Sequence, residues 1–142
     1  MDRADVLDRI MAVCERDGPV AVWARLLERL RERPEAVMAA VKHGPVRVQV
    51  TVRGCRGDAR WVYFTAHGHV AVMPGPSPMA RRDGPHLILN GSAGEVVSAL
   101  LGVTELEVAV AAGVLLPMAP EPHWREVVNV VVDALVALSD GD

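Results

Sequence analysis

The segment from His86 to Pro117 constrains the fold more than any other part of the sequence. It opens with an apolar stretch that ends at Ser92 and continues through two stretches of helical character, which end at Gly102 and Gly113. An apolar run, residues 114–116, closes the segment. Short apolar runs bounded by polar or glycine residues are typical of strands, and longer periodic stretches are typical of helices. The segment therefore predicts the order strand, helix, helix, strand.

Both helices of this segment carry start and stop signals. Ser92 with Glu95, and Thr104 with Glu107, match the capping box, in which each side chain accepts a hydrogen bond from the other residue's backbone N–H. A glycine follows each helix, where a left-handed residue commonly ends it. We therefore expect helices that begin directly after Ser92 and Thr104.

The rest of the chain predicts a single α+β domain over residues 1–142. Apolar residues recur at helical spacing before residue 44 and after residue 121, whereas valine alternates with polar residues in 46–53. We expect N-terminal helices in 1–44, a sheet with a helical insert in 45–117, and a C-terminal helix in 118–142. The sheet should be antiparallel or mixed, with about five strands and helices on one face. The remaining strands are expected at 46–53, 60–66 and 69–73.

Composition and charge argue against two classes of function. The net charge is −3 and aromatic residues make up 4% of the chain, whereas nucleic-acid-binding domains are usually basic and place aromatics among Lys and Arg. The longest apolar run, Val127–Leu138, is shorter than the roughly 20 residues that span a bilayer. Cys14 and Cys55 are too few for a disulfide framework. We expect a cytoplasmic protein without a nucleic-acid partner or a transmembrane segment.

The order of elements resembles that of the sterol carrier protein family across roughly the whole chain. The local resemblance is best from Val46 to Leu116. Gly68 corresponds to the family's hairpin glycine, Gly102 to the glycine between two helices, and Gly113 to the glycine before the last strand. The family tends to have glycine and an acidic residue after that strand, where residues 117–120 here read Pro-Met-Ala-Pro. The resemblance implies binding of a lipid, a sterol or another apolar small molecule, or a role as a dimerisation or accessory module.

The predicted C-terminal helix is apolar around most of its circumference. Its polar line consists of Glu126, Asn129 and Asp133. A helix of this kind is usually buried on most sides. A packed core, a ligand cavity or a partner subunit would each account for the apolar surface.

The strand predicted at residues 60–66 has large side chains on both faces. Trp61 and Tyr63 share one face, and Val62 and Phe64 share the other. Trp61 and Tyr63 each combine an apolar body with a polar atom, which suits a cavity that orients a mostly apolar guest. A second subunit or solvent would satisfy the same face equally well.

The leading hypothesis is an apolar small molecule bound in a cavity between the sheet and the C-terminal helices. The ligand would be a lipid, a sterol-like or a polyketide-like compound, and no cofactor or metal ion is expected. Trp61, Tyr63, Asn90 or His86 would orient it. The expected apolar walls are Val96, Val97, Leu100, Leu101, Leu106, Val110, Trp124, Val128, Val131 and Leu135.

Two alternatives stay open. The first is a cofactor-independent cyclase or isomerase that acts on a hydrophobic natural product in biosynthesis, for which a shaped cavity with one or two acid–base groups suffices. Its candidate residues are His86, Tyr63, His69 and Asp83. The second is a homodimerising module without a ligand, which would pair through the face that carries Trp61 and Tyr63.

The histidines and one long loop are further candidates for function. His67 and His69 could approach His86 and His123, but their spacing matches no metal-binding motif. The loop Pro74–Pro85 contains methionine and two arginines among prolines and glycines, so it could close over an apolar cavity and hold an acidic head group. An ordinary solvated connection would have the same composition.

Overall fold

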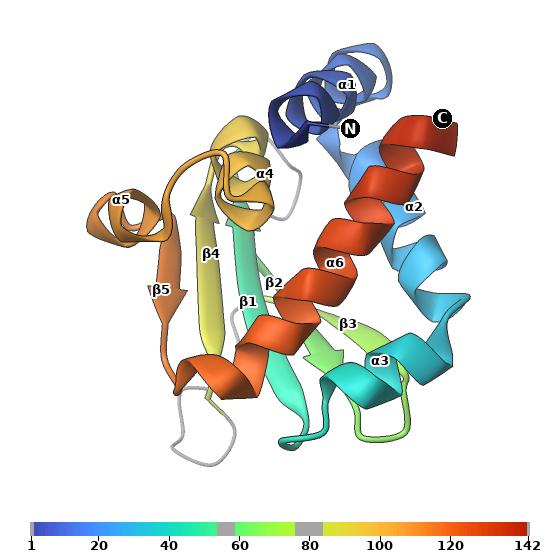
Figure 1. The fold of residues 1–142 in the computed structure, drawn as a ribbon, viewed down its shortest axis with the longest axis vertical. Coiled ribbons are helices and arrows are strands. Elements are labelled where there is room, and N and C mark those ends of the chain that lie inside the picture. Colours follow the sequence, from blue (N-terminus) through green and yellow to red (C-terminus); the bar gives the residue numbers. More distant parts are fainter. Residues whose placement is uncertain (1, 54–58, 76–83, 142) are drawn as a thin grey trace.

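A five-stranded mixed sheet with helices packed on one face forms the centre of the fold (Figure 1). The computed structural model describes residues 2–53, 59–75 and 84–141. The order across the sheet is β3-β2-β1-β4-β5, in which β1 and β4 run parallel and all other neighbours run antiparallel. The strands are β1 (Val46–Val52), β2 (Ala59–Phe64), β3 (Val70–Pro74), β4 (Leu87–Gly91) and β5 (Leu115–Pro117). The predicted α+β class is confirmed.

The helices occur in the three places that the sequence predicted. The first three precede the sheet, the next two connect β4 to β5, and the last follows β5. They are α1 (Arg3–Asp17), α2 (Pro19–Arg31), α3 (Pro34–Ala40), α4 (Ala93–Leu101), α5 (Leu106–Ala111) and α6 (Glu121–Gly141). Figure 1 shows α4 and α6 crossing in front of the sheet, with α1 and α2 beside them.

The two faces of the sheet differ because side chains alternate along each strand. Val46, Val48 and Val50 of β1 are buried under the helices, whereas the residues between them are half-buried. In β2, Val62 and Phe64 are buried on the same face, while Trp61 and Tyr63 lie on the other. No helix among the described residues covers that second face, which we call the open face.

Helix α6 is buried along most of its length, as its sequence predicted. It packs against α1, α2, α3, α4 and β1. Trp124 is 1% exposed, and its indole N–H donates to the Ala119 carbonyl at 3.1 Å. Asn129 and Asp133, two members of the predicted polar line, are exposed. Among the described residues, we find no helix that is both long and apolar enough to cross a bilayer.

One of the two predicted capping boxes is present and the other is wrong. Ser92 Oγ accepts from the Glu95 N–H at 3.2 Å, and Glu95 Oε1 accepts from the Ser92 N–H at 3.0 Å. Thr104 does not cap α5. The helix begins at Leu106, after Glu105, which is one residue later than a cap at Thr104 would require. The Thr104 hydroxyl instead lies 2.7 Å from the hydroxyl of Ser98, which is buried in α4. This side-chain pair joins α4 to the loop between α4 and α5. It also occupies the Thr104 hydroxyl, which a capping box would need as its hydrogen-bond acceptor.

Candidate functional site

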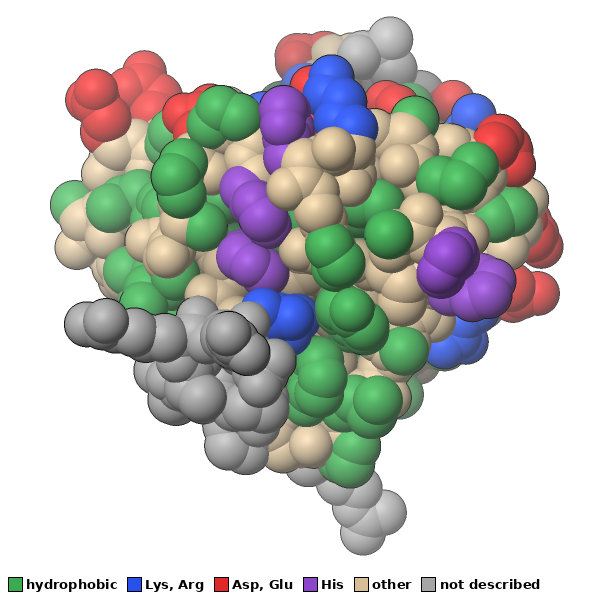
Figure 2. Space-filling view, turned by 90° about the horizontal axis from the view of Figure 1, so that it is seen from below, with side chains coloured by type: hydrophobic (Ala, Val, Ile, Leu, Met, Phe, Trp, Pro, Cys, Tyr) green, Lys and Arg blue, Asp and Glu red, His purple; other side chains and the backbone are tan. Residues whose placement is uncertain are grey.

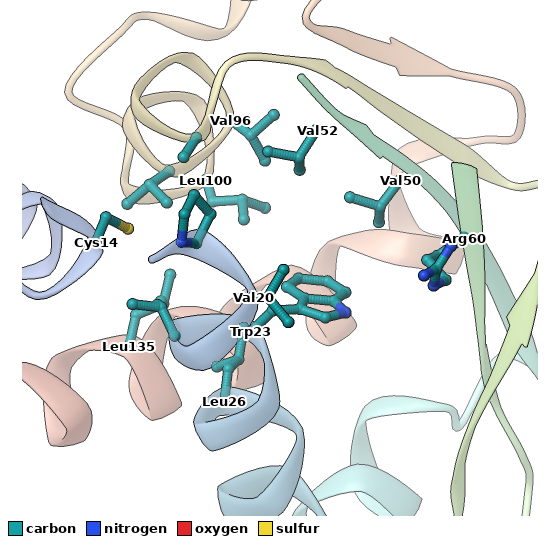
Figure 3. A pocket seen from close by; sticks show the side chains of 14 residues that line it. Cys14, Val20, Trp23, Leu26, Val50, Val52, Arg60, Val96, Leu100 and Leu135 are labelled. Atoms are coloured by element: carbon teal, nitrogen blue, oxygen red, sulfur yellow. The ribbon is translucent and has the colours of Figure 1, made fainter. Parts of the chain in front are cut away.

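A cavity of about 300 Å³ lies between the N-terminal helices, α4 and the sheet (Figure 3). The N-terminal helices contribute Cys14, Pro19, Val20, Val22, Trp23 and Leu26. The sheet contributes Val50, Val52 and Arg60. Helices α4 and α6 contribute Ala93, Val96, Val97, Leu100 and Leu135. Its volume is at the lower end of the range for small-molecule sites.

Two helical stripes with identical spacing form opposite walls of this cavity. In α2 the stripe is Pro19, Val22, Trp23 and Leu26, and in α4 it is Ala93, Val96, Val97 and Leu100. Positions i, i+3, i+4 and i+7 share one helix face, so each stripe presents a continuous apolar surface. Helices α1 and α6 each pack against both α2 and α4, which fixes how far apart the two stripes lie.

The short side chains of α4 explain why the space stays unfilled. Ala93, Val96 and Val97 reach less far than leucine or phenylalanine would, and they face Val50 and Val52 at the end of β1. The capping box of Ser92 starts α4 directly after β4, which sets this stripe over the sheet. The cavity is partly open to solvent, since Val20 in its lining is 57% exposed, and apolar clefts of this size are typical of small-molecule sites.

Charge enters the cavity at one position. Among the described lining residues, Arg60 is the one with a charged side chain. It lies on β2 opposite Val50 of β1, and its side chain projects to the helix-covered face of the sheet. Figure 3 shows Arg60 on one side of the cavity and Cys14 of α1 on the other. The cavity is thus an apolar space with a cationic end.

A smaller void of about 30 Å³ continues from this cavity into the core. It shares Trp23, Leu26, Val50 and Leu100 with the larger cavity. A void of this size has room for a water molecule, which needs roughly 10–15 Å³ of such space. The indole of Trp23 contributes to the lining of both spaces, so a change in its rotamer would alter the division between them.

The predicted apolar walls are divided between the cavity and its surroundings. Val96, Val97, Leu100 and Leu135 line the cavity. Val128 and Val131 line the smaller void. Leu101 and Trp124 are buried in the core without lining either space, Leu106 is half-buried and Val110 is exposed on α5.

The residues predicted to orient the ligand do not line the cavity. Trp61 and Tyr63 lie on the open face, with ring centroids 6.2 Å apart, and the Arg47 guanidinium carbon is 5.9 Å from the centre of the Tyr63 ring. Asn90 is exposed at the end of β4. The structure thus brings four of the predicted apolar wall residues together with residues of α1 and α2, and it leaves the predicted polar set outside the cavity.

His86, a further predicted site residue, lies at the opposite end of the sheet beside His123. The Nδ1 atom of His86 accepts a hydrogen bond from the Arg47 backbone N–H at 2.9 Å. The backbone N–H of His86 donates to the Arg47 carbonyl oxygen at 2.8 Å. His123 Nε2 lies 3.0 Å from the Pro45 carbonyl oxygen, to which it donates. Burial, then the nearby charges of His123 and Arg47, lower the pKa of His86 to about 4. Histidines at this end of the molecule are visible at its surface in Figure 2.

The remaining catalytic candidates do not converge with the cavity. His67 and His69 are exposed in the turn before β3, and Asp83 lies outside the described residues, as does most of the proposed lid at 74–85. Within the described part of the chain, three or more His, Cys, Asp or Glu residues nowhere gather as metal ligands would.

The sequence hypothesis missed the wall that α1 and α2 provide. The stripe of α2 was visible as an amphipathic pattern, but periodicity shows only which side of a helix is apolar and not what it faces. Arg60 had a clearer signal, because it occupies the same strand face as Val62 and Phe64. No family model, curated protein or solved structure matches this chain.

Proposed function

We propose that this protein binds a small apolar molecule in the cavity between α2, α4 and the sheet. The observation that carries the proposal is an apolar cavity of about 300 Å³, partly open to solvent and lined by two helical stripes and the end of β1. Each methylene moved from water into apolar surroundings contributes about 0.8 kcal/mol. A ligand that fills the space therefore gains enough free energy to offset the cost of association.

The order of elements supports the same proposal. The structure has the order predicted from the sequence, with two helices between the last two strands, and the resemblance to the sterol carrier protein family rests on this order. We therefore propose kinship with that family on element order, and binding on the cavity itself.

Binding is better supported than catalysis. The described residues that line the cavity include no histidine, carboxylate or tyrosine that could transfer a proton. A cyclase or isomerase would need such a group within hydrogen-bond reach of its substrate. His86, Tyr63 and His69 do not supply it, because none of them lines the cavity.

Native mass spectrometry of the freshly purified protein, followed by organic extraction, tests the proposal. We expect a mass increment that disappears on denaturation, and an extractable apolar compound. Val97→Phe should reduce the bound fraction, because the larger ring fills part of the cavity. Val108→Phe introduces the same ring at an exposed position on α5 and should leave the bound fraction unchanged.

Apo protein does not by itself decide the question, because the expression host need not make the ligand. Added 1-decanol, a neutral linear probe, should then bind by calorimetry to the wild type and less tightly to Val97→Phe. No detectable decanol binding in the wild type would contradict the proposal.

A second candidate is self-association through the open face. One row of that face runs through Met73, Trp61, Gln49, Ile88 and Leu116, which are neighbours across all five strands. Four of these five side chains are large and mainly apolar, and Met73 is 40% exposed. A second copy could cover this row, and this role would be independent of the cavity.

A further inference from the structure

Arg60 departs from the pattern of the strand face on which it lies. The residues that share its face in β2 are Val62 and Phe64, which are 2% and 3% exposed. An arginine in such a row brings a charged group to the edge of an apolar cavity. Departures from local patterning of this kind are expected at functional sites.

The position of Arg60 fits recognition of a ligand's end. Figure 3 places it on the opposite side of the cavity from Cys14, with the apolar side chains of α2 and α4 between them. Arg60 already takes part in an interaction within the protein. A guanidinium has five N–H donors in a planar fork, so it can keep that interaction and still bind an oxyanion.

The first turn of α2 also contributes positive potential to the cavity. Pro19 and Val20 line the cavity at the helix N-terminus, which has positive partial charge. Within the described residues, no side chain caps this end of α2 and its first turn contains no acidic residue. An anionic group near Arg60 would therefore meet a cationic donor and no described carboxylate in the lining.

The volume limits the apolar part of the ligand. About 300 Å³ is at the lower end of the range of roughly 300–1,000 Å³ for small-molecule sites, so we expect a small ligand with a single short chain. We take a single chain of about ten carbons as the test length for a ligand of this size.

From these observations we infer that the ligand is a medium-chain amphipathic acid, whose anionic group binds Arg60 and whose chain extends between α2 and α4 toward Cys14. The inference rests on the proposed function, because it assigns a ligand class to the same cavity. It adds a charge requirement and a length limit that an apolar cavity alone does not imply.

Decanoate, 1-decanol and decylamine share a ten-carbon chain and differ in charge. Their titration by calorimetry at pH 7.5 separates binding of the apolar chain from the requirement for an anionic group. We expect decanoate to bind about tenfold more tightly than decanol, since a charge-assisted hydrogen bond is worth about that factor at a partly solvated site. Decylammonium should bind least tightly, because its charge has the same sign as that of Arg60.

Substitutions of Arg60 test whether this side chain sets the preference. Arg60→Gln should bring decanoate affinity down to about that of decanol and lower decanol affinity much less, and a cooperative thermal unfolding transition would show that the variant is folded. Arg60→Lys should keep part of the preference. Arg9→Gln removes the same charge from an exposed position on α1 outside the cavity and should bind like the wild type.

Each other outcome overturns a defined part. Equal affinities of wild-type protein for decanoate and decanol would overturn the inference and leave the proposed function intact. If Arg60→Gln still binds decanoate more tightly than decanol, the role of Arg60 is overturned. The same holds if the substitution lowers the affinities for decanoate and decanol by the same factor. Failure of all three probes would overturn the proposed function together with the inference.

A chain-length series checks the size limit. From hexanoate to decanoate, each added methylene should increase affinity about fourfold. Beyond about ten carbons the gain should stop, because further methylenes remain in water. A gain that continues to tetradecanoate would contradict the length limit while leaving the charge requirement standing.

Discussion

The imidazole rings of His86 and His123 stack on each other, with centroids 4.2 Å apart and ring planes inclined by 24°. The pair joins the start of β4 to the first turn of α6. His86 also takes the place of a backbone acceptor, because its Nδ1 accepts a hydrogen bond from the Arg47 N–H near the start of β1. Protonation at Nδ1 would remove this hydrogen bond and place a charge against the neighbouring ring and Arg47.

We predict that this arrangement makes folding stability depend on pH. The pKa of His86 is about 4 in the folded protein and near 6.5 in the unfolded chain, so the unfolded chain takes up the proton first as the pH falls. Its contribution is complete above pH 6.5, declines down to about pH 4 and is constant below. The expected loss is on the order of 2 kcal/mol, measured by urea denaturation across this range.

The control for this prediction is His86→Phe, which keeps a flat ring against His123 but cannot bind a proton. This variant should be less stable than the wild type at pH 7 and should lose less stability between pH 6.5 and 4. If its stability falls by as much as that of the wild type over this interval, His86 is not the source.

Gly68 is predicted to tolerate no side chain. Its φ is 81°, and a Cβ there would overlap the Pro34 carbonyl oxygen. Gly113 has a similar φ of 74°, with no atom near the position of its Cβ. A left-handed conformation costs a non-glycine residue about 1–2 kcal/mol. We expect a loss of this size for Gly113→Ala, and about 3 kcal/mol or more for Gly68→Ala, where overpacking adds to it. Equal losses in denaturant titrations would show that the contact with α3 yields easily.

The Thr104 hydroxyl is predicted to stabilise the fold through Ser98 and not as a helix cap. Thr104→Val should cost about 1 kcal/mol, because the buried Ser98 hydroxyl loses its partner. In a Ser98→Ala background the same substitution should cost much less. A double-mutant cycle from chemical denaturation measures this difference. If Thr104→Val lowers the free energy of unfolding by the same amount in the Ser98→Ala background, the pair with Ser98 is not the source of the stabilisation.

Self-association through the open face predicts a concentration-dependent dimer in sedimentation velocity. Trp61→Glu should shift it to monomer, because a charge would then be buried in the centre of the interface. Val108→Glu adds the same charge on α5, where the side chain is 55% exposed, and should leave the association unchanged. Monomeric wild-type protein at every accessible concentration would exclude this role.

Local sequence determined the elements of this protein and their order. The capping box of Ser92 and Glu95 and the left-handed glycines 102 and 113 are formed by residues close in sequence, so their geometry could be predicted without the fold. The alternation of valine in β1 likewise determined which of its side chains are buried. Thr104 shows the limit of such reasoning. Its hydroxyl pairs with Ser98, which is also close in sequence, but the capping-box pattern compares Thr104 with Glu107 alone.

The tertiary structure decided where the cavity lies and which residues face it. Strand β2 carries large side chains on both faces, with Trp61 and Tyr63 on one and Val62 and Phe64 on the other. The alternation separated these two pairs but did not show which pair the helices would cover. The pairing of β2 with β1 decided this, because it aligns Val62 and Arg60 with the buried valines Val48 and Val50. Likewise, the stripe of α2 became a cavity wall only when α1 and α6 held it opposite α4. Periodicity defines an apolar side within each element, whereas a cavity depends on the distance between elements, and that distance is set by contacts far apart in the sequence.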